Sequence, residues 1–356
     1  MSRHQDNSFG KDNAAYEAWL HTQCDVVAKD VRHKHEKMKE SAFIFLRATY
    51  FRWARTIPTL CPELMDAPRV LSVGDMHLEN FGTWRDAEGR LVWGVNDFDE
   101  AAVMPYPLDL VRLAASVRLA PRGKLDKQAA AAAVLKGYRA GLAAPRPALL
   151  DESDTWMLRH AVAARKTSEK FWSDVAKFPR AHPSRKLMRH LVESLPKHAD
   201  NVEYFRRVAG SGSLGRPRYV AIANWRGGRV LREAKALVPS AWVWANGEEN
   251  ASSHFLELAT ANYRAPDPFL EARHGFVIRR LAPDSRKIEL GHKAGTVLRA
   301  NLLWAMGYDL GSVHAAGSPG AKELLADLKQ RPRGWLNAAA KTAAAAVRRD
   351  YHEWCG

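Results

Sequence analysis

This 356-residue chain has few cysteines and no long apolar run, and these two deficits exclude whole classes of protein. Its three cysteines (Cys24, Cys61 and Cys355) are too scattered for a disulfide framework or a zinc cluster. No segment approaches the roughly 20 apolar residues that span a bilayer, and residues 1–13 contain no apolar signal-peptide core. These features predict a cytoplasmic protein without a membrane span.

Acidic residues are also in deficit, with 39 Asp and Glu against 54 Lys and Arg and a net charge of +15. Such a charge favours anionic partners, among them nucleotides, phosphorylated metabolites and nucleic acid. A solvated basic surface in an arginine-rich chain explains the same excess, so the charge permits nucleic-acid binding without favouring it. The hydrophobic share of 46% and the length are sufficient for a globular protein with two packed lobes.

The predicted elements follow one another in blocks along the chain. Apolar periodicity predicts helices over residues 14–58, 107–117, 127–143, 185–195 and 293–315, and again from residue 321 into the alanine-rich end. Short β-branched or aromatic runs predict strands at 69–74, 91–96, 204–208, 219–223, 229–232, 276–281 and 288–290. The polar segment 85–90 predicts a hairpin turn. We therefore expect an α+β fold with a compact β-rich block at about 202–290.

The strongest candidate for chemistry is the segment Val73–Gly82, which contains the motif Gly-Asp-x-His-x-x-Asn directly after a predicted strand. Phosphoryl transfer needs a carboxylate near the attacking hydroxyl and an oxygen that coordinates metal. The Asp-x-x-x-x-Asn spacing of Asp75 and Asn80 lets one loop serve both purposes. Asp, Asn and Gly also suit ordinary turns, so this motif gains weight only from its neighbours in the sequence.

A second acidic segment, Asn96-Asp-Phe-Asp-Glu100, follows the next predicted strand. An ionised Asp97 at this position would supply a hard oxygen ligand for Mg²⁺, which takes one or two protein carboxylates together with phosphate oxygens. Asp99 and Glu100 either assist a second metal ion or point to solvent. The two acidic segments together favour a metal-dependent reaction at phosphate.

A complete G-x-G-x-x-G motif supplies five candidate nucleotide-binding residues, which are Gly210, Ser211, Gly212, Ser213 and Gly215. The motif lies between two predicted strands, not between a strand and a helix. That setting is typical of the glycine-rich hairpin that covers the phosphates in kinases, and an ordinary hairpin turn is the alternative. Lys235, at the end of a later strand, is the best candidate for the lysine that holds the α- and β-phosphates.

With the segment Pro107-Leu-Asp-Leu, these motifs resemble the catalytic core of aminoglycoside and choline kinases, which are distant relatives of protein kinases. The resemblance implies Asp75 as the catalytic base and Asn80 and Asp97 as metal ligands. It also implies that Asp109, at the head of a buried helix, braces the catalytic loop, and we assign His77 a loop-supporting role. The implied cofactors are ATP and Mg²⁺, with Mn²⁺ as the alternative ion.

The motifs occur in a different order from that of an ordinary kinase, in which the glycine loop and lysine precede the catalytic loop. A circular permutation resolves the difference, because it is tolerated where chain termini lie close together at the surface. We therefore expect a circularly permuted, protein-kinase-like fold. Residues 1–200 would form a helical lobe with both acidic loops, 201–291 a smaller antiparallel β-rich lobe over the nucleotide, and 292–356 helices that return to the helical lobe.

The chain also resembles a bacterial family known as domain of unknown function 2252. The segments that support this resemblance are Met38–Arg47, Gly74–Gly82, Asn96–Glu100, Gly210–Gly215 and Glu233–Lys235. Two departures are present, since Ala42 replaces an expected proline and Lys235 lies slightly later than expected.

A kinase-like site also needs a glutamate that pairs with Lys235, and Glu257 is the first choice, with Glu249 second.

The expected function is phosphoryl transfer from ATP to an unknown hydroxyl acceptor, and there are three alternatives to it. Transfer of a nucleotidyl (AMP) group requires only that ATP binds in reverse. A nucleotide-sensing or nucleic-acid-binding pseudoenzyme is compatible with the charge, although intact Asp75, Asn80 and Asp97 argue against lost catalysis. A metallophosphoesterase shares the Gly-Asp-x-His start, but its two-metal chemistry requires a histidine cluster that the sequence does not supply.

Overall fold

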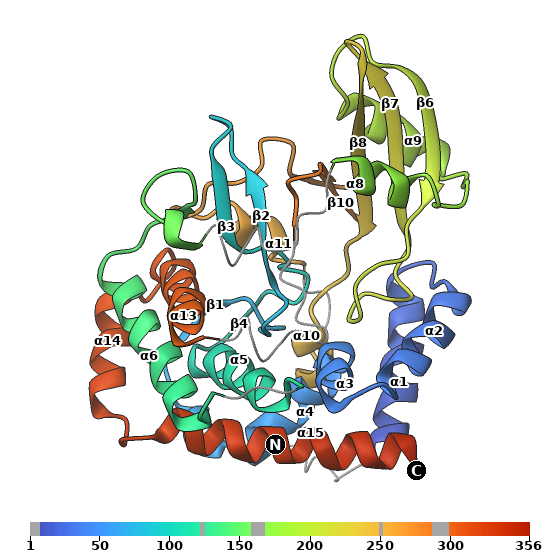
Figure 1. The fold of residues 1–356 in the computed structure, drawn as a ribbon. Coiled ribbons are helices and arrows are strands. Elements are labelled where there is room, and N and C mark those ends of the chain that lie inside the picture. Colours follow the sequence, from blue (N-terminus) through green and yellow to red (C-terminus); the bar gives the residue numbers. More distant parts are fainter. Residues whose placement is uncertain (1–7, 122–124, 158–167, 249–251, 287–298) are drawn as a thin grey trace.

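The computed structural model describes residues 8–121, 125–157, 168–248, 252–286 and 299–356. The fold is mixed α+β, and the strands of the described residues pair in antiparallel sheets. Figure 1 shows a broad base of helices with two groups of strands above it. Within this part of the chain, no helix combines the length and apolar character that crossing a bilayer requires.

The helical base is built from both ends of the chain. Its helices are α1 (Phe9–Gln23), α2 (Ala28–Met38), α3 (Ala42–Ala48), α4 (Tyr50–Leu60), α5 (Pro107–Leu119), α6 (Lys127–Ala143), α13 (Ala300–Ala315), α14 (Ala321–Gln330) and α15 (Trp335–Cys355), together with α10 (Ala241–Asn246) from the middle of the chain. The short helix α11 (Phe255–Ala259) lies above this base, at the level of the strands (Figure 1). The prediction of helix at 127–143 is confirmed with these bounds. The predicted helical region 14–58 is divided, because Ser41 caps a new helix by accepting a hydrogen bond from Ile44 N.

The core of the base depends on the close approach of α6 and α13. A Cβ atom added to Gly307 would lie 2.0 Å from Val134 O, and one added to Gly137 would lie 1.9 Å from Trp304 O. No side chain fits at such distances, so glycine allows the two backbones to touch. The contact holds α13 against the rest of the base, where its Asp309 and His314 reach the strands and α5.

Two short ladders above the base bring the acidic loops together. Strand β1 (Arg69–Ser72) pairs with β4 (Ala102–Pro105), whereas β2 (Phe81–Arg85) pairs with β3 (Leu91–Val95), and β5 (Ala148–Leu149) extends the latter ladder. The segment 85–90 is the turn of the β2–β3 hairpin. Strand β2 was not predicted, and it takes the place of the predicted strand 69–74 as the partner of β3.

The β-rich block forms a separate five-stranded sheet in the order β6-β7-β8-β10-β9. Its strands are β6 (Asp200–Arg206), β7 (Arg218–Trp225), β8 (Gly228–Ala236), β9 (Glu271–Arg273) and β10 (Phe276–Arg280). Register pairs Arg218 with Lys235 and Glu233 with Arg279, so these four side chains lie on one face of the sheet. The opposite face carries Ala221, Ala234 and Ile278, which pack on α9 (Arg185–Glu193).

The helical lobe is predicted from the sequence to end at residue 200, but the two helices that precede this residue pack on the five-stranded sheet. Leu187 and Leu191 of α9 pack on one face, and Val175 of α8 (Ser168–Val175) packs against Val220 and Leu231 on the other. These amphipathic helices therefore belong with the sheet and not with the helical base. The predicted strand 288–290 and the start of the predicted helix 293–315 lie outside the described residues, and α13 begins at Ala300.

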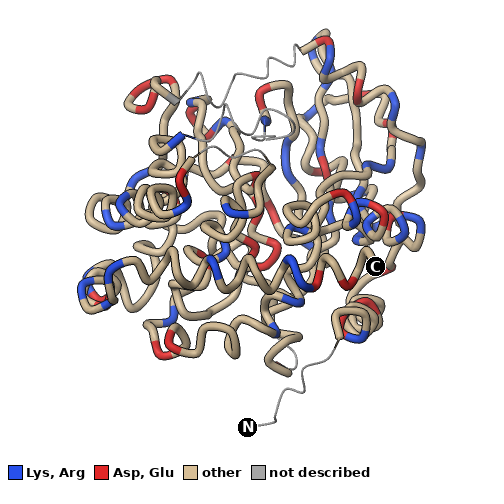
Figure 2. The backbone as a smooth tube through the Cα atoms, turned by 60° about the horizontal axis from the view of Figure 1, so that its bottom comes forward, with Lys and Arg blue, Asp and Glu red and all other residues tan. Residues whose placement is uncertain are grey.

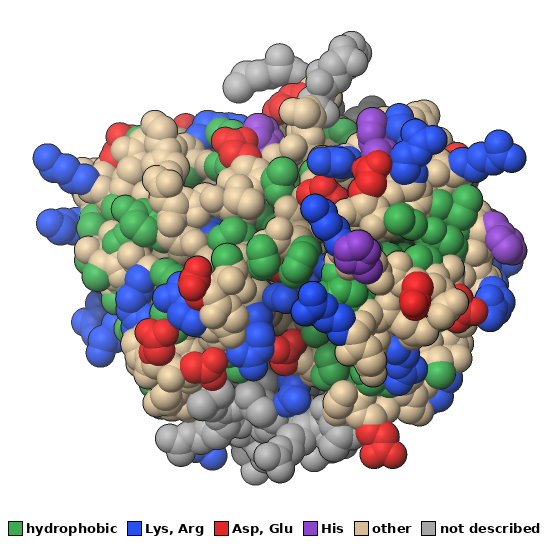
Figure 3. Space-filling model, turned by 90° about the horizontal axis from the view of Figure 1, so that it is seen from above, with side chains coloured by type: hydrophobic (Ala, Val, Ile, Leu, Met, Phe, Trp, Pro, Cys, Tyr) green, Lys and Arg blue, Asp and Glu red, His purple; other side chains and the backbone are tan. Residues whose placement is uncertain are grey.

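Charge is distributed unevenly along the fold. Figure 2 shows acidic positions crossing the middle of the chain trace, where the loops between the short ladders lie. Figure 3, which views the molecule from above the sheets, shows Lys and Arg side chains scattered over this face with acidic ones between them. The excess of basic residues does not form one continuous patch on that face.

The α6–α13 contact predicts a large effect of a small substitution. Gly307→Ala should lower the free energy of unfolding by about 2 kcal/mol or more, because the new methyl group must push two backbones apart. Gly10→Ala is the matched control, since a Cβ there meets nothing within 4 Å, and it should leave stability unchanged or raise it by up to about 1 kcal/mol. Urea unfolding measures both, and equal stability of the two variants would contradict the packing described here.

Candidate functional site

The candidate site begins with two loops that the short ladders hold side by side. Residues 73–80 join β1 to β2, and residues 96–101 join β3 to β4. Because β1 pairs with β4 and β2 with β3, each end of the first loop lies beside one end of the second. Gly74 has φ +86°, and a Cβ on it would lie 2.1 Å from Glu100 O, so only glycine permits this contact.

Asp109 anchors the first loop from the start of α5. Its buried carboxylate accepts hydrogen bonds from Val73 N at 2.7 Å and Gly74 N at 2.9 Å. His314 Nε2 on α13 lies 3.1 Å from the same carboxylate. Asp109 therefore braces the first loop, the role that the resemblance to aminoglycoside and choline kinases implies.

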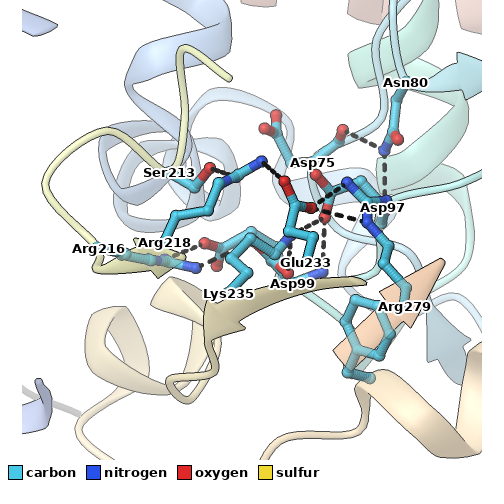
Figure 4. Close-up of polar contacts among 12 residues, drawn as sticks. Asp75, Asn80, Asp97, Asp99, Ser213, Arg216, Arg218, Glu233, Lys235 and Arg279 are labelled. Atoms are coloured by element: carbon cyan, nitrogen blue, oxygen red, sulfur yellow. Dashed lines mark hydrogen bonds and ion pairs between the residues drawn. The ribbon is translucent and has the colours of Figure 1, made fainter. Parts of the chain in front are cut away.

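Asp75 points into the space between the two loops and the glycine-rich segment (Figure 4). Arg112 donates to Asp75 Oδ1 from Nε at 2.8 Å and from Nη2 at 2.5 Å. Burial raises the pKa of Asp75 even though Arg112 opposes the shift. His77 Nδ1 accepts a hydrogen bond from Glu79 N at 3.1 Å, and its Nε2 lies 3.9 Å from Asp75 Oδ2. A carboxylate with a raised pKa beside an open space has the character of a general base.

Asn80 and Asp97 supply oxygens that fit a hard divalent cation. Asn80 Nδ2 donates to Asp75 O at 3.2 Å and to Asp97 O at 3.1 Å, which fixes the orientation of the amide. Its Oδ1 is buried and has no hydrogen-bond partner among the described residues. These residues contain no group of three or more His, Cys, Asp and Glu side chains suited to a metal. A cation at Asn80 and Asp97 would therefore complete its shell with water or phosphate oxygens, as Mg²⁺ does.

The glycine-rich segment Gly210–Gly215 joins β6 to β7 and descends onto Asp75. A Cβ on Gly212 would lie 2.9 Å from Arg47 O and 3.4 Å from Asp75 Oδ2. Val27 N donates to Gly215 O at 2.8 Å, so the start of α2 holds the far end of the segment. Gly210, Ser211 and Ser213 line the same space beside Asp75. The two motifs therefore meet, although more than a hundred residues separate them.

Lys235 connects the sheet to the second acidic loop. Its Nζ lies 3.0 Å from Asp97 Oδ1 and 2.6 Å from Asp99 Oδ1, and its side chain is 3% exposed. Burial raises the pKa of Asp99, and Asp97 adds to the shift, while Lys235 and Arg216 oppose it. Asp99 thus pairs with two cations and does not point to solvent. The structure brings Asp75, Asn80, Asp97, Asp99 and Lys235 to one place.

Glu257 does not take part in this arrangement, contrary to the prediction that it pairs with Lys235. Its side chain is 66% exposed, and its Oε2 lies 2.7 Å from His254 Nδ1. Lys235 instead contacts Asp97 and Asp99, because its position on β8 directs its side chain toward the second acidic loop. Glu249, the second choice, lies outside the described residues.

A different glutamate, Glu233, is the buried acid of the sheet. Its carboxylate forms ion pairs with Arg218 at 3.4 Å and with Arg279 at 2.7 Å (Figure 4). It also forms an ion pair with Arg207. Burial alone would raise the pKa of Glu233, but the three guanidinium groups hold it well below its ordinary value. Glu233 precedes Lys235 by two residues on β8 and points to the same face.

Three charged residues of the site were not assigned a role from the sequence. Arg112 is an arginine in an otherwise apolar helix one turn after Asp109, and a buried charge in such a setting requires a partner. Arg216 donates to Glu100 Oε1 at 2.7 Å, and Glu233 stands in an arginine-rich strand. The neighbouring residues of Arg112 and Glu233 therefore indicate that each is a buried charge with a partner. The sequence around Arg216 gives no such indication, because its partner Glu100 lies more than a hundred residues away.

A cavity of about 300 Å³ adjoins the site on the side of the sheet. Its apolar walls include Phe98, Leu231 and Leu281, and α8 closes one side with Phe171 and Val175. Arg207 and Arg279 of the Glu233 cluster and Asn96, the neighbour of Asp97, also line it. An apolar cavity of this size with a few convergent polar groups is typical of small-molecule sites.

The Glu233 cluster predicts an acid-sensitive contribution to stability. Because the pKa of Glu233 is lower in the folded than in the unfolded chain, its stabilisation is present above about pH 4.3 and is lost as the pH falls below that value. Glu233→Gln leaves three guanidinium groups without their anion and should cost about 3 kcal/mol at pH 7. Glu257→Gln is the control and should change stability by less than about 0.5 kcal/mol.

Urea unfolding at pH 7 and pH 3.5 measures this contribution. The gap between wild type and Glu233→Gln should narrow at the lower pH, where the wild-type carboxylate begins to lose its advantage. A gap that is absent at pH 7, or that widens at pH 3.5, would show that the cluster does not stabilise the fold in this way.

Comparison with known proteins identifies a family and leaves its chemistry open. No curated protein and no solved structure matches the chain. The family described as "Uncharacterized protein conserved in bacteria (DUF2252)" matches residues 26–203, half of the chain. The matched region contains both acidic loops and Asp109, and it ends before the glycine-rich segment and Lys235. The chain belongs to this bacterial family.

Proposed function

We propose that the protein is an ATP- and Mg²⁺-dependent phosphotransferase with a circularly permuted, protein-kinase-like fold. One observation carries the proposal. Lys235 pairs with Asp97 and Asp99 at the place where the glycine-rich segment lies against Asp75. A basic residue from a sheet, a phosphate-covering loop and two acidic loops are the parts that phosphoryl transfer uses.

The permuted order is supported by the position of the two ends of the helical base. The ring of Phe9 on α1 lies 5.5 Å from the ring of Trp354 on α15. An ordinary kinase order would require a connection between these ends and a break before β6. Ends that lie in contact make such a rearrangement sterically simple.

The nucleotide would extend from the larger cavity toward Asp75. The apolar walls of the 300 Å³ cavity suit a base, and the segment that follows β10 lines it with Leu281 and Pro283. Arg207 and Arg279 would lie beside the sugar and α-phosphate, and Lys235 beside the next phosphate. The terminal phosphate would then reach the space under Gly212 and beside Asp75.

Each residue of the acidic loops has a separate task in this proposal. Asp97 and the unpartnered Asn80 Oδ1 would hold Mg²⁺, which supplies neutralisation of the phosphate charge when it is bound. Asp75 accepts the proton of the acceptor hydroxyl, and Arg112 holds its carboxylate in position. Most of the rate enhancement would come from positioning and charge, because this reaction needs little covalent participation from the protein.

ATP labelled separately at the α- and γ-positions tests the proposal directly. With Mg²⁺ and a metabolite extract, the γ-label should move to an acceptor, and chelation of the metal should stop the transfer. Movement of the α-label would identify nucleotidyl transfer instead, and ATP binding without movement of either label would identify a pseudokinase. The experiment also finds the acceptor.

Two variants connect the transfer to the site. Asp75→Ala and Asp97→Ala should each lower the transfer of label by about a hundredfold or more, because one loses the base and the other a metal ligand. Glu257→Gln, outside the cleft, should retain wild-type activity. Circular dichroism checks that each variant is folded. Wild-type transfer by folded Asp97→Ala would remove Asp97 from the metal site.

A further inference from the structure

A second, smaller cavity of about 50 Å³ lies beside Asp75 and shares no lining residue with the apolar cavity. The acidic loops form its floor, and Gly210, Ser211, Gly212 and Ser213 form its roof. Its third wall comes from the N-terminal helices, with Tyr16 of α1, Lys34 of α2 and Arg47 of α3. Since one water needs roughly 10–15 Å³ by the same measure, this space suits a group the size of a phosphate and is too small for a nucleotide.

Lys34 stands out among the cations that line this cavity. Its side chain is buried, with 4% of the residue exposed, and Nζ lies 5.8 Å and 5.7 Å from the ring centres of Tyr16 and Phe51. No hydrogen bond or ion pair joins Nζ to any other residue that the structure describes. A buried ammonium group without an anion is unfavourable, so its position calls for a partner that comes from outside the chain.

The acids whose charges act on Lys34 are Glu17, Glu100 and Asp75, and each already has a partner of its own. Glu17 Oε1 lies 2.6 Å from His35 Nε2. Asp75 is held by Arg112, and Glu100 accepts hydrogen bonds from Arg216 at 2.7 Å and from Ala241 N at 2.6 Å. The other cations of the cavity are also paired, with Arg47 2.5 Å from Glu79. The charged and titratable groups that act on Lys34 or line the cavity with it are Tyr16, Glu17, Arg47, Tyr50, Asp75, His77, Asp97, Asp99, Glu100 and Arg216. Lys34 thus differs from its neighbours in having no anion assigned to it.

We propose that Lys34 binds the phosphoryl group in transit and that the small cavity is the site of transfer, an inference that rests on the proposed function. The bond between the acceptor oxygen and phosphorus forms as the bond to the ADP oxygen breaks. The hydroxyl proton passes to Asp75, and ADP leaves with the electron pair of the broken bond. Lys34 contacts the non-bridging oxygens during this exchange, and Asp97 and Asn80 would hold the cation.

The protonation state of Lys34 agrees with this role and makes phosphate binding depend on pH. Burial lowers the pKa of Lys34 to about 8, and the nearby acids only partly oppose the shift. The ammonium form binds an oxyanion, and the neutral amine does not. Binding of phosphate in this cavity should therefore weaken as the pH rises through 8.

Calorimetric titration with inorganic phosphate in MgCl₂ tests the inference on the full-length protein. Wild type should bind phosphate at pH 7 and at least tenfold more weakly at pH 9. Lys34→Met should bind at least tenfold more weakly than wild type at pH 7, and Lys29→Met, an exposed lysine of the same helix, should bind as wild type does. Equal affinity of wild type and Lys34→Met, or no binding by wild type, would overturn the assignment.

Two further measurements separate this inference from structural effects and from the proposed function. Lys34→Met should be at least as resistant to thermal unfolding as wild type, because it removes an unpaired buried charge, and a clear loss would indicate a structural role instead. Titration with Mg-ADP tests the nucleotide site alone. If the wild-type protein binds phosphate but not Mg-ADP, the proposed function is refuted. If it binds Mg-ADP but not phosphate, the phosphoryl site at Lys34 is refuted.

Discussion

The site depends on the ion pairs that Lys235 forms with Asp97 and Asp99. The Lys235 side chain is 3% exposed, so it needs anions close to it. The acid on the same face of its sheet, Glu233, is already paired with arginines. The loop between β3 and β4 supplies the missing charge. Breaking such a buried pair from one side typically costs about 3–5 kcal/mol, so the contact fixes how the sheet sits over the acidic loops. The glycine-rich segment joins two strands of that sheet, so the same contact helps to place it over Asp75.

The charged side chains around this contact are paired with one another, both on the sheet and in the acidic loops. On the face of the sheet, Arg218, Glu233 and Arg279 neutralise one another next to Lys235. Below, Arg112 and Arg216 each hold a carboxylate of an acidic loop. Buried acids with raised pKa values therefore stand beside fixed guanidinium groups, and the protein itself holds the charges of the site in place.

The sequence predicted the local features of this site better than the long-range ones. The acidic loops, Asp109 and the strand position of Lys235 have signals within a few residues, since turn residues follow apolar runs and a proline starts α5. Strand β2 was missed because Phe81–Arg85 directly follows the Gly-Asp-x-His-x-x-Asn motif and carries glycine and threonine. Glu257 was predicted to pair with Lys235, but the actual partners, Asp97 and Asp99, lie more than a hundred residues earlier in the chain, and no local signal connects them to Lys235. The permuted kinase fold itself stays a prediction.

The most direct measurement is a crystal structure with Mg²⁺ and a non-hydrolysable ATP analogue. The account predicts a triphosphate between Gly212 and Asp97, with the cation on Asp97 and Asn80 Oδ1 and a phosphate oxygen near Lys235. An analogue bound away from both acidic loops, or a cation that contacts neither Asp97 nor Asn80, would contradict it.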